Sequence, residues 1–273
     1  MAPVVDRALC LRRHPFSESS LVVHVLTAEH GRVHLLARGA YRPASRYFAV
    51  LDLFDELELE WDASPRHELQ NLRAGSVRVR RRVIRTDIDR YRAAVSVLEL
   101  SDIAARHMSH DPRAFALADE SLTALELAES PAEETLVRFQ LGLLAHLGLE
   151  PALARCAACG HKAPAVMQKP EPRAAFSAGA GGRLCKDCAT EARAAGRRVG
   201  TLPVSVLEDG RLLADSQARI SPPLSALRLE RVRDFVGRFL DYHLETRPKS
   251  HRAFLAAPNR NALASASGEL DSA

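Results

Sequence analysis

The stretch LDLFDELELEW, residues 51–61, carries the clearest β-strand pattern of the chain. At its end Leu57, Leu59 and Trp61 alternate with three glutamates, so one face of a strand would be apolar and the other acidic. This period of two is typical of a half-buried antiparallel strand, which packs one face on a core and leaves the other in water. Residues 51–61 therefore predict that this part of the chain forms a β-sheet.

Short apolar runs flank this strand on both sides. They lie at residues 4–5, 9–11, 20–27, 32–38, 68–72 and 77–84. Five or six short strands within about 80 residues are typical of a small barrel or sandwich, and a five-stranded OB-fold fits that number. We therefore expect an N-terminal OB-fold β-barrel over residues 1–84.

Beyond residue 85 the apolar residues recur at spacings of three and four, which predicts helices. A first helix runs from about residue 88, and Asp111 before Pro112 starts a second, because the acid can cap the proline-led first turn. Ser130 before Pro131 starts a third in the same way, with Glu133 placed for a capping box.

A last long helix opens around residues 222–224 and carries apolar residues on one face. They are Leu229, Val232, Val236, Phe239 and Leu240. We expect residues 85–154 and 201–256 to form one helical domain, and residues 257–273 to form a disordered tail. The predicted fold class is α+β, with several domains.

Four of the five cysteines form two Cys-x-x-Cys pairs. The pairs are Cys156 with Cys159 and Cys185 with Cys188. Each such turn points two thiolates at one position about 2.3 Å from each sulfur, and two turns complete the tetrahedron of a structural zinc ion. Residues 160–184 hold too few apolar side chains for a core, so the metal would organise them. We expect an inserted Zn²⁺ module over residues 155–200.

Two disulfides, a redox pair and cysteines without a shared role are the alternatives. Asp6 and Arg7 interrupt the N-terminal segment too early for the apolar core of a signal peptide, which argues against disulfides. A redox pair would lie beside a βαβ pattern, and the sequence has none here. Four thiolate ligands would leave no position for water, so we do not expect the metal to be catalytic.

Composition permits a nucleic-acid partner without requiring one. Only four of the 38 basic residues are lysines, and the others are arginines. The planar guanidinium of arginine can bind a phosphate through two parallel hydrogen bonds, which the ammonium group of lysine does less well. A GC-rich genome, whose codons favour arginine, would produce the same excess of arginine over lysine. The net charge is only +4, so any contact with DNA must come from local basic patches. No run approaches the roughly 18–20 apolar residues of a membrane span.

A first basic patch lies between two predicted strands. Arg38, Arg42 and Arg46 follow one another at four-residue spacing, and Tyr41, Tyr47 and Phe48 lie between and beside them. OB-folds hold single strands through phosphate contacts and the stacking of bases on aromatic rings. We therefore expect Arg38, Arg42, Arg46 and Tyr41 to bind DNA. The alternative is a solvated loop whose aromatic side chains cover the end of the barrel.

A second patch lies in the last predicted strand, residues 77–84. Arg78, Arg80 and Arg82 would project from one face, with valines on the other. We expect these three arginines to bind DNA as well. The alternative is an edge strand whose charges prevent aggregation.

Motifs of enzyme active sites are absent from the sequence. It contains no phosphate-binding G-x-x-x-x-G-K-[ST], no G-x-G-x-x-G after a strand, no G-x-S-x-G and no H-E-x-x-H. The histidines at 14, 24, 30 and 34 are spread over different strands and turns, which indicates surface or core positions. We expect no enzymatic activity.

Several short motifs stand in a fixed order within residues 5–256. They are ALCL at 8–11, SESS at 17–20, LT at 26–27, RGA at 38–40, YRAAVSVLEL at 91–100, FLDYHL at 239–244, KS at 249–250 and FL at 254–255. In order and spacing they resemble the RecO family of bacterial DNA repair and recombination mediators.

The resemblance implies an OB-fold, a helical domain and an inserted zinc module. It also implies binding of single- and double-stranded DNA and annealing of complementary strands, including strands coated by single-strand binding protein (SSB). The implied partners are SSB, through its acidic C-terminal tail, and RecR, with which the family helps to load RecA. The implied location is the cytoplasm, in association with the nucleoid.

Some family members lack the four cysteines, which agrees with a structural metal. This sequence uses arginine where other members use lysine. The alternative function is a zinc-bearing adaptor that bridges SSB and RecR without contacting DNA itself.

Overall fold

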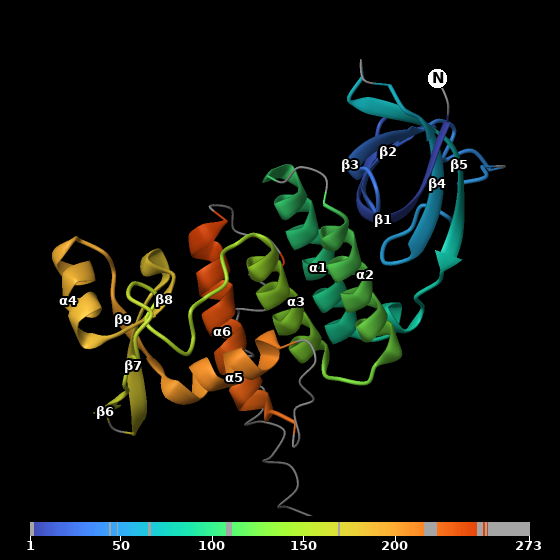
Figure 1. Ribbon diagram of the computed structural model, residues 1–273. Coiled ribbons are helices and arrows are strands. Elements are labelled where there is room, and N and C mark those ends of the chain that lie inside the picture. Colours follow the sequence, from blue (N-terminus) through green and yellow to red (C-terminus); the bar gives the residue numbers. More distant parts are fainter. Residues whose placement is uncertain are drawn as a thin grey trace, which may run out of the picture.

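The computed structural model describes residues 3–43, 45–47, 49–64, 67–107, 111–168, 170–215, 223–244, 248 and 250 (Figure 1). A β-barrel lies at one end of the molecule, a layer of helices lies in the middle, and a small sheet with one helix lies at the other end (Figure 1). The predicted fold class, a barrel with a helical domain and a four-cysteine module, is confirmed. The predicted tail, residues 257–273, lies outside the described residues.

Five strands close the N-terminal barrel. They are β1 (Pro3–Pro15), β2 (Leu21–Thr27), β3 (Gly31–Ala37), β4 (Glu56–Asp62) and β5 (Leu69–Val79). Their order is β1-β2-β3-β5-β4, and β3 pairs with β5 in parallel while the other neighbours are antiparallel. The alternating segment at residues 56–62 is β4, whose Leu57, Leu59 and Trp61 are buried in the barrel.

The end of the barrel differs from the prediction. Residues 68–72 and 77–84 are not two strands, because β5 runs through both segments and ends at Val79. The chain then turns into the short 3₁₀ helix η1 (Val83–Arg85). It turns because the Arg81 side chain enters the interior, so the alternation of Arg78, Arg80 and Arg82 on one strand face is not formed.

Five helices form the middle layer. They are α1 (Ile88–His107), α2 (Pro112–Leu127), α3 (Ala132–His146), α5 (Val204–Ala214) and α6 (Ala226–His243). Asp111 caps α2 as predicted, since its carboxylate accepts a hydrogen bond from the Arg113 amide. The capping box predicted at Glu133 is wrong: α3 has no side-chain cap, and Glu133 forms an ion pair with Arg233 of α6 at 2.8 Å.

The cysteine segment folds into a small sheet that the sequence pattern does not predict. Its strands are β6 (Val166–Gln168), β7 (Glu171–Ser177), β8 (Gly182–Leu184) and β9 (Gly200–Pro203); the turn η2 (Ala178–Ala180) and helix α4 (Lys186–Ala194) lie beside them. Phe176 of β7 packs edge-on against Phe235 of α6, with 5.1 Å between ring centroids. The module is therefore anchored on the helical layer through β7.

Two buried polar clusters join the barrel to the helices. In the first, Arg81 is only 1% exposed and donates to the Phe54 carbonyl at 2.7 Å. It also donates to the Asp119 carboxylate at 2.7 Å and to the Thr123 hydroxyl at 2.8 Å, both on α2. A buried guanidinium is costly unless it is paired and hydrogen-bonded, and the bonds from the two terminal nitrogens of Arg81 fix α2 against the barrel.

In the second cluster, the fully buried Asp102 of α1 pairs with three arginines. Arg32 of β3 and Arg106 of α1 donate to it at 2.8 and 2.7 Å, and Arg12 of β1 forms an ion pair with it at 2.8 Å. Burial raises the pKa of Asp102, but the bond from Arg106 and the charges of Arg32 and Arg12 outweigh it, so the pKa lies below its ordinary value. The carboxylate therefore stays charged and holds α1 on two strands.

None of the described helices is both long and apolar enough to span a lipid bilayer.

Replacing Arg81 by methionine should destabilise the protein by about 2–4 kcal/mol, because it leaves Asp119 and the Phe54 carbonyl without their buried donor. Urea unfolding measures the change. Arg82→Met is the matched control, since the Arg82 side chain is exposed and forms no ion pair within the described residues, and it should stay within about 0.5 kcal/mol of the parent. Equal losses in both variants would contradict the structural role of Arg81.

Candidate metal centre and nucleic-acid interface

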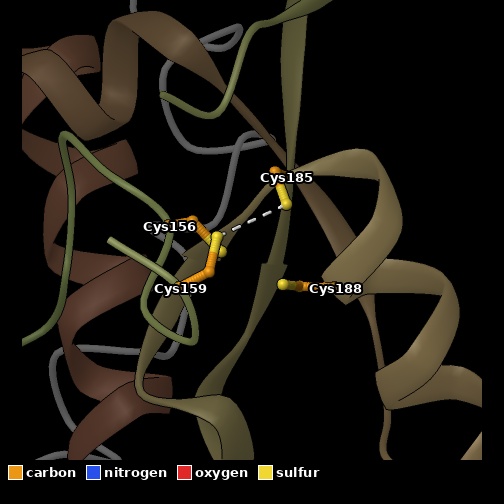
Figure 2. Close-up of side chains that lie close together, drawn as sticks. All are labelled: Cys156, Cys159, Cys185 and Cys188. Atoms are coloured by element: carbon orange, nitrogen blue, oxygen red, sulfur yellow. Dashed lines mark hydrogen bonds between the residues drawn. The ribbon is translucent and has the colours of Figure 1, made fainter. Parts of the chain in front are cut away.

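Two turns bring the sulfur atoms of four cysteines close together (Figure 2). The cysteines are Cys156, Cys159, Cys185 and Cys188. Cys156 and Cys159 lie in the loop that follows α3, Cys185 is the N-cap of α4, and Cys188 lies in its first turn. All four sulfur atoms lie within 4.8 Å of one another, and Sγ of Cys159 is 3.8 Å from Sγ of Cys185.

Two glycines allow the two cysteine-containing segments to come close to one another. Gly160 has a φ of +72° and donates its amide to the Cys156 carbonyl at 2.9 Å, which closes the first turn in a conformation that favours glycine. At Gly182 of β8, a Cβ atom would lie 2.5 Å from the Ala152 carbonyl oxygen. Glycine there lets the β7–β8 hairpin pack directly on the segment that leads into Cys156.

The donor set fits a tetrahedral metal ion. Four sulfurs placed about 2.3 Å from one centre are separated by about 3.8 Å, the distance observed between Cys159 and Cys185. Burial raises the pKa of Cys156, but backbone amides of Cys185, Cys159 and Ala158 outweigh it and hold the pKa at about 6. Hydrogen bonding to Cys185 and Cys159 raises the pKa of Cys188. Four thiolates at this spacing would repel one another, and a cation between them would offset that repulsion.

The apolar core around the cysteines is very small. Among the described residues its buried members are Cys156, Ala163, Leu184 and Ala189. Such a cluster removes little apolar surface from water, so it adds little to the stability of the module. The four cysteines can hold a metal ion, and all four positions of its tetrahedron would then be taken by protein ligands.

The first basic patch is a loop between β3 and β4 that exposes its arginines. Arg38, Arg42 and Arg46 are exposed, and none of the three pairs with a carboxylate in the part of the chain that the structure describes. Among the residues that the structure describes, Arg38 donates to the Asn71 side chain alone, at 3.3 Å. Tyr41 is 52% exposed. We call residues 38–47 the arginine loop; Ala44 in it and Phe48 beside it lie outside the described residues.

Tyr47 anchors this loop instead of facing solvent. Its ring is buried in the barrel core, and its hydroxyl donates to the Leu72 carbonyl at 2.9 Å. The guanidinium of Arg46 lies 5.6 Å from the centre of the same ring. The tyrosine thus fixes the base of the loop while the arginines remain exposed.

The second patch is not a free basic row. Arg78 pairs with Glu56 at 3.3 Å and with Glu58 at 3.1 Å, and Arg80 pairs with Asp55 at 2.7 Å. These acids belong to β4 and the segment before it, because β5 lies beside β4 in the barrel. Arg82 lies beyond the strand, at the N-cap of η1. The acidic face that makes β4 recognisable therefore neutralises the arginines of its neighbour.

The structure also brings together three histidines that are far apart in sequence. The rings of His14 and His24 lie 5.2 Å apart, and those of His24 and His34 stack at 4.2 Å. His24 and His34 are direct partners in the β2–β3 pairing. Only the strand register, which one sequence does not supply, could have revealed this row.

Two family models match the chain. Recombination protein O N terminal matches residues 1–79, and Recombination protein O C terminal matches residues 85–252. The gap between the two matches contains Arg81, which joins the barrel to α2.

Curated relatives agree with the family models. DNA repair protein RecO of Anaeromyxobacter dehalogenans strain 2CP-1 is 34% identical over 255 residues, which cover 91% of this chain and 96% of that protein. DNA repair protein RecO of Myxococcus xanthus is 30% identical over 245 residues, covering 90% and 94%. The chain belongs to the RecO family of DNA repair and recombination proteins.

Proposed function

We propose that this protein binds single- and double-stranded DNA and anneals complementary strands, including strands coated by SSB. The observation that carries the proposal is the arginine loop, which offers Arg38, Arg42 and Arg46 without carboxylate partners among the described residues, next to the exposed ring of Tyr41. Membership of a DNA repair family supports this assignment of the loop.

Annealing in this proposal involves no making or breaking of covalent bonds, so the protein acts without being an enzyme. Guanidinium groups neutralise the phosphates of two strands and lower their mutual repulsion. Stacking on an aromatic ring tolerates every base, so the strands can shift until their bases pair. The proposed partners are SSB, through its acidic C-terminal tail, and RecR, with which the protein would promote the loading of RecA.

We further propose that the four cysteines hold Zn²⁺ as a structural ion. Four thiolates in a tetrahedron are the ligand set of structural zinc sites, and a metal with no open position serves folding and not catalysis. The module it organises packs on α6 through Phe176, far along the chain from the arginine loop. The metal and the DNA surface would therefore have separate tasks.

Chelation should release one zinc ion per chain and loosen residues 155–200 while the barrel stays folded. Metal analysis and hydrogen exchange measure the two effects. Cys159→Ser should reproduce them. Cys10→Ala is the control: Cys10 is buried in the barrel core and is not one of the four clustered cysteines, so this variant should keep its zinc. Zinc release accompanied by unfolding of the barrel would contradict a separate module.

Neutralising the arginine loop should weaken binding to single-stranded DNA. If Arg38, Arg42 and Arg46 each neutralise one phosphate, log affinity should fall with log salt at a slope near −2, and the double variant Arg42→Gln/Arg46→Gln should reduce that slope to about −0.7. Fluorescence anisotropy with a labelled oligonucleotide measures both. Arg78→Gln is the matched control, because its charge is already paired with Glu56 and Glu58. A slope unchanged in the double variant would remove the loop from the interface.

The function itself is tested by annealing two complementary oligonucleotides, each coated with the cognate SSB. The protein should accelerate annealing, and the acceleration should fall at moderate salt because the phosphate contacts are screened. Binding to SSB without acceleration would overturn the annealing proposal in favour of an adaptor that bridges other proteins. Absence of both binding and acceleration would show that the family fold is present here without the proposed activity.

A further inference from the structure

A cavity of about 620 Å³ lies where the barrel meets α1. Its walls include Arg32 and His34 of β3, Trp61 of β4, Gln70 of β5 and Arg106 of α1. Figure 1 shows α1 beside the barrel, and α1 contacts β1, β2 and β3. Small-molecule and nucleotide sites have volumes of this order. The cavity is separate from the arginine loop and from the cysteines.

Its α1 side carries an excess of positive charge. Among the described residues, Asp102 is the one carboxylate that pairs with Arg12, Arg32 and Arg106, so three guanidinium charges meet one negative charge. Arg106 uses one bond to Asp102, keeps its side chain 44% exposed, and lines the cavity. An arginine has five N–H donors, so Arg106 retains donors for an anion such as a phosphate.

A second feature of the cavity is the uncharged ring of His34, which stacks on the ring of His24. Burial lowers the pKa of His24 to about 4, and burial and the charge of Arg32 lower the pKa of His34. The two rings are therefore neutral near pH 7 and stack at 4.2 Å, with His34 facing the cavity. Trp61 borders the same cavity but is almost fully buried in the barrel core. Aromatic rings, histidine included, are surfaces on which unpaired bases stack, and His34 is the ring available here.

The cavity and the arginine loop lie along one face of β3. Arg32 and His34 lie on the outer face of β3, because the alternate residues Leu35 and Ala37 are buried in the barrel core, and Arg38 follows the end of the strand with the same alternation. His34 and Arg38 are four positions apart, which corresponds to about 13 Å of extended chain. OB-folds bind oligonucleotides across this strand and its neighbours, with the loop between β4 and β5 alongside. A single DNA strand bound by the arginine loop would therefore reach the cavity by following β3.

We propose that this cavity seats one unpaired nucleotide of a single DNA strand, with its base against the ring of His34 and its phosphate at Arg106. The proposal rests on the DNA binding proposed above. A base paired in a duplex is not free to leave its partner, so the cavity would distinguish single from double strands. The one acidic side chain among the described residues that line it is Glu68, whose carboxylate lies 3.3 Å from His34 and is 87% exposed.

Two variants with opposite expected effects test this site. Arg106→Gln removes a phosphate donor and should weaken binding to a thymidine oligonucleotide of about ten residues by about fivefold. Glu68→Gln removes the negative charge at the cavity and should tighten the same binding by about twofold. Neither should change the affinity for a duplex of equal length. Arg92→Gln, on the same helix with a 51% exposed side chain paired to Asp89, is the control and should leave both affinities unchanged.

The chain itself supplies a reporter, because Trp61 is its single tryptophan. Oligonucleotide binding should change tryptophan fluorescence in step with anisotropy, and duplex binding should not. Filling the cavity with Ala105→Phe should abolish the fluorescence change while the arginine loop still gives binding by anisotropy. Circular dichroism and urea unfolding confirm that each variant is folded.

The outcomes separate the two proposals. Normal binding by anisotropy, with no fluorescence change and no effect of Arg106→Gln or Glu68→Gln, would overturn the nucleotide site and leave the proposed function intact. Equal weakening of single-strand and duplex binding by Arg106→Gln would overturn the preference for an unpaired nucleotide. Absence of any DNA binding by the parent protein would overturn the proposed function and this site together.

Discussion

The buried guanidinium of Arg81 is the interaction on which the arrangement of this molecule depends. A charge that is 1% exposed must be met by bonded partners, and these come from two places: the Phe54 carbonyl beside the barrel, and Asp119 and Thr123 on α2. The chain reaches these partners by leaving β5 at Val79 and turning into η1. Arg81 therefore ends the barrel and sets the position of the helical layer in one step.

Asp102 has a similar structural role where α1 contacts the barrel. It is a buried carboxylate on a helix that binds arginines of two strands, whereas Arg81 is a buried arginine of the barrel that binds a carboxylate of a helix. Each is costly to remove, because either deletion leaves the opposite charge without its partner. The Asp102 contact holds α1 against the barrel, while the Arg81 contact holds α2, the neighbour of α1. Only a fixed relation between α1 and the barrel can maintain a cavity whose walls come from both. The proposed nucleotide site thus depends on the contacts that assemble the fold.

Local patterns in the sequence predict the parts of this protein whose structure is decided locally. The alternation in residues 56–62, the cap at Asp111 and the spacing of the four cysteines each act through neighbouring residues, and each is found in the structure. The pairing of Arg78 with Glu56 and the stacking of His24 on His34 depend on which strands lie side by side and in what register. One sequence does not contain that register. The small sheet around the cysteines escapes prediction because its strands are three to seven residues long and carry few apolar side chains.

The register also decides which arginines can act on DNA. The amino-acid composition does not distinguish Arg38 from Arg78. In the structure, Arg78 pairs with the glutamates of β4, whereas Arg38 lies after the end of β3 and contacts the uncharged side chain of Asn71. An arginine already paired with a carboxylate must give up that pair to bind phosphate, so its net contribution is smaller than that of a free one. With 38 basic and 34 acidic residues, most charges in this protein can find a partner within it. The interface is therefore defined less by where arginine is abundant than by where the fold leaves arginine without an acid.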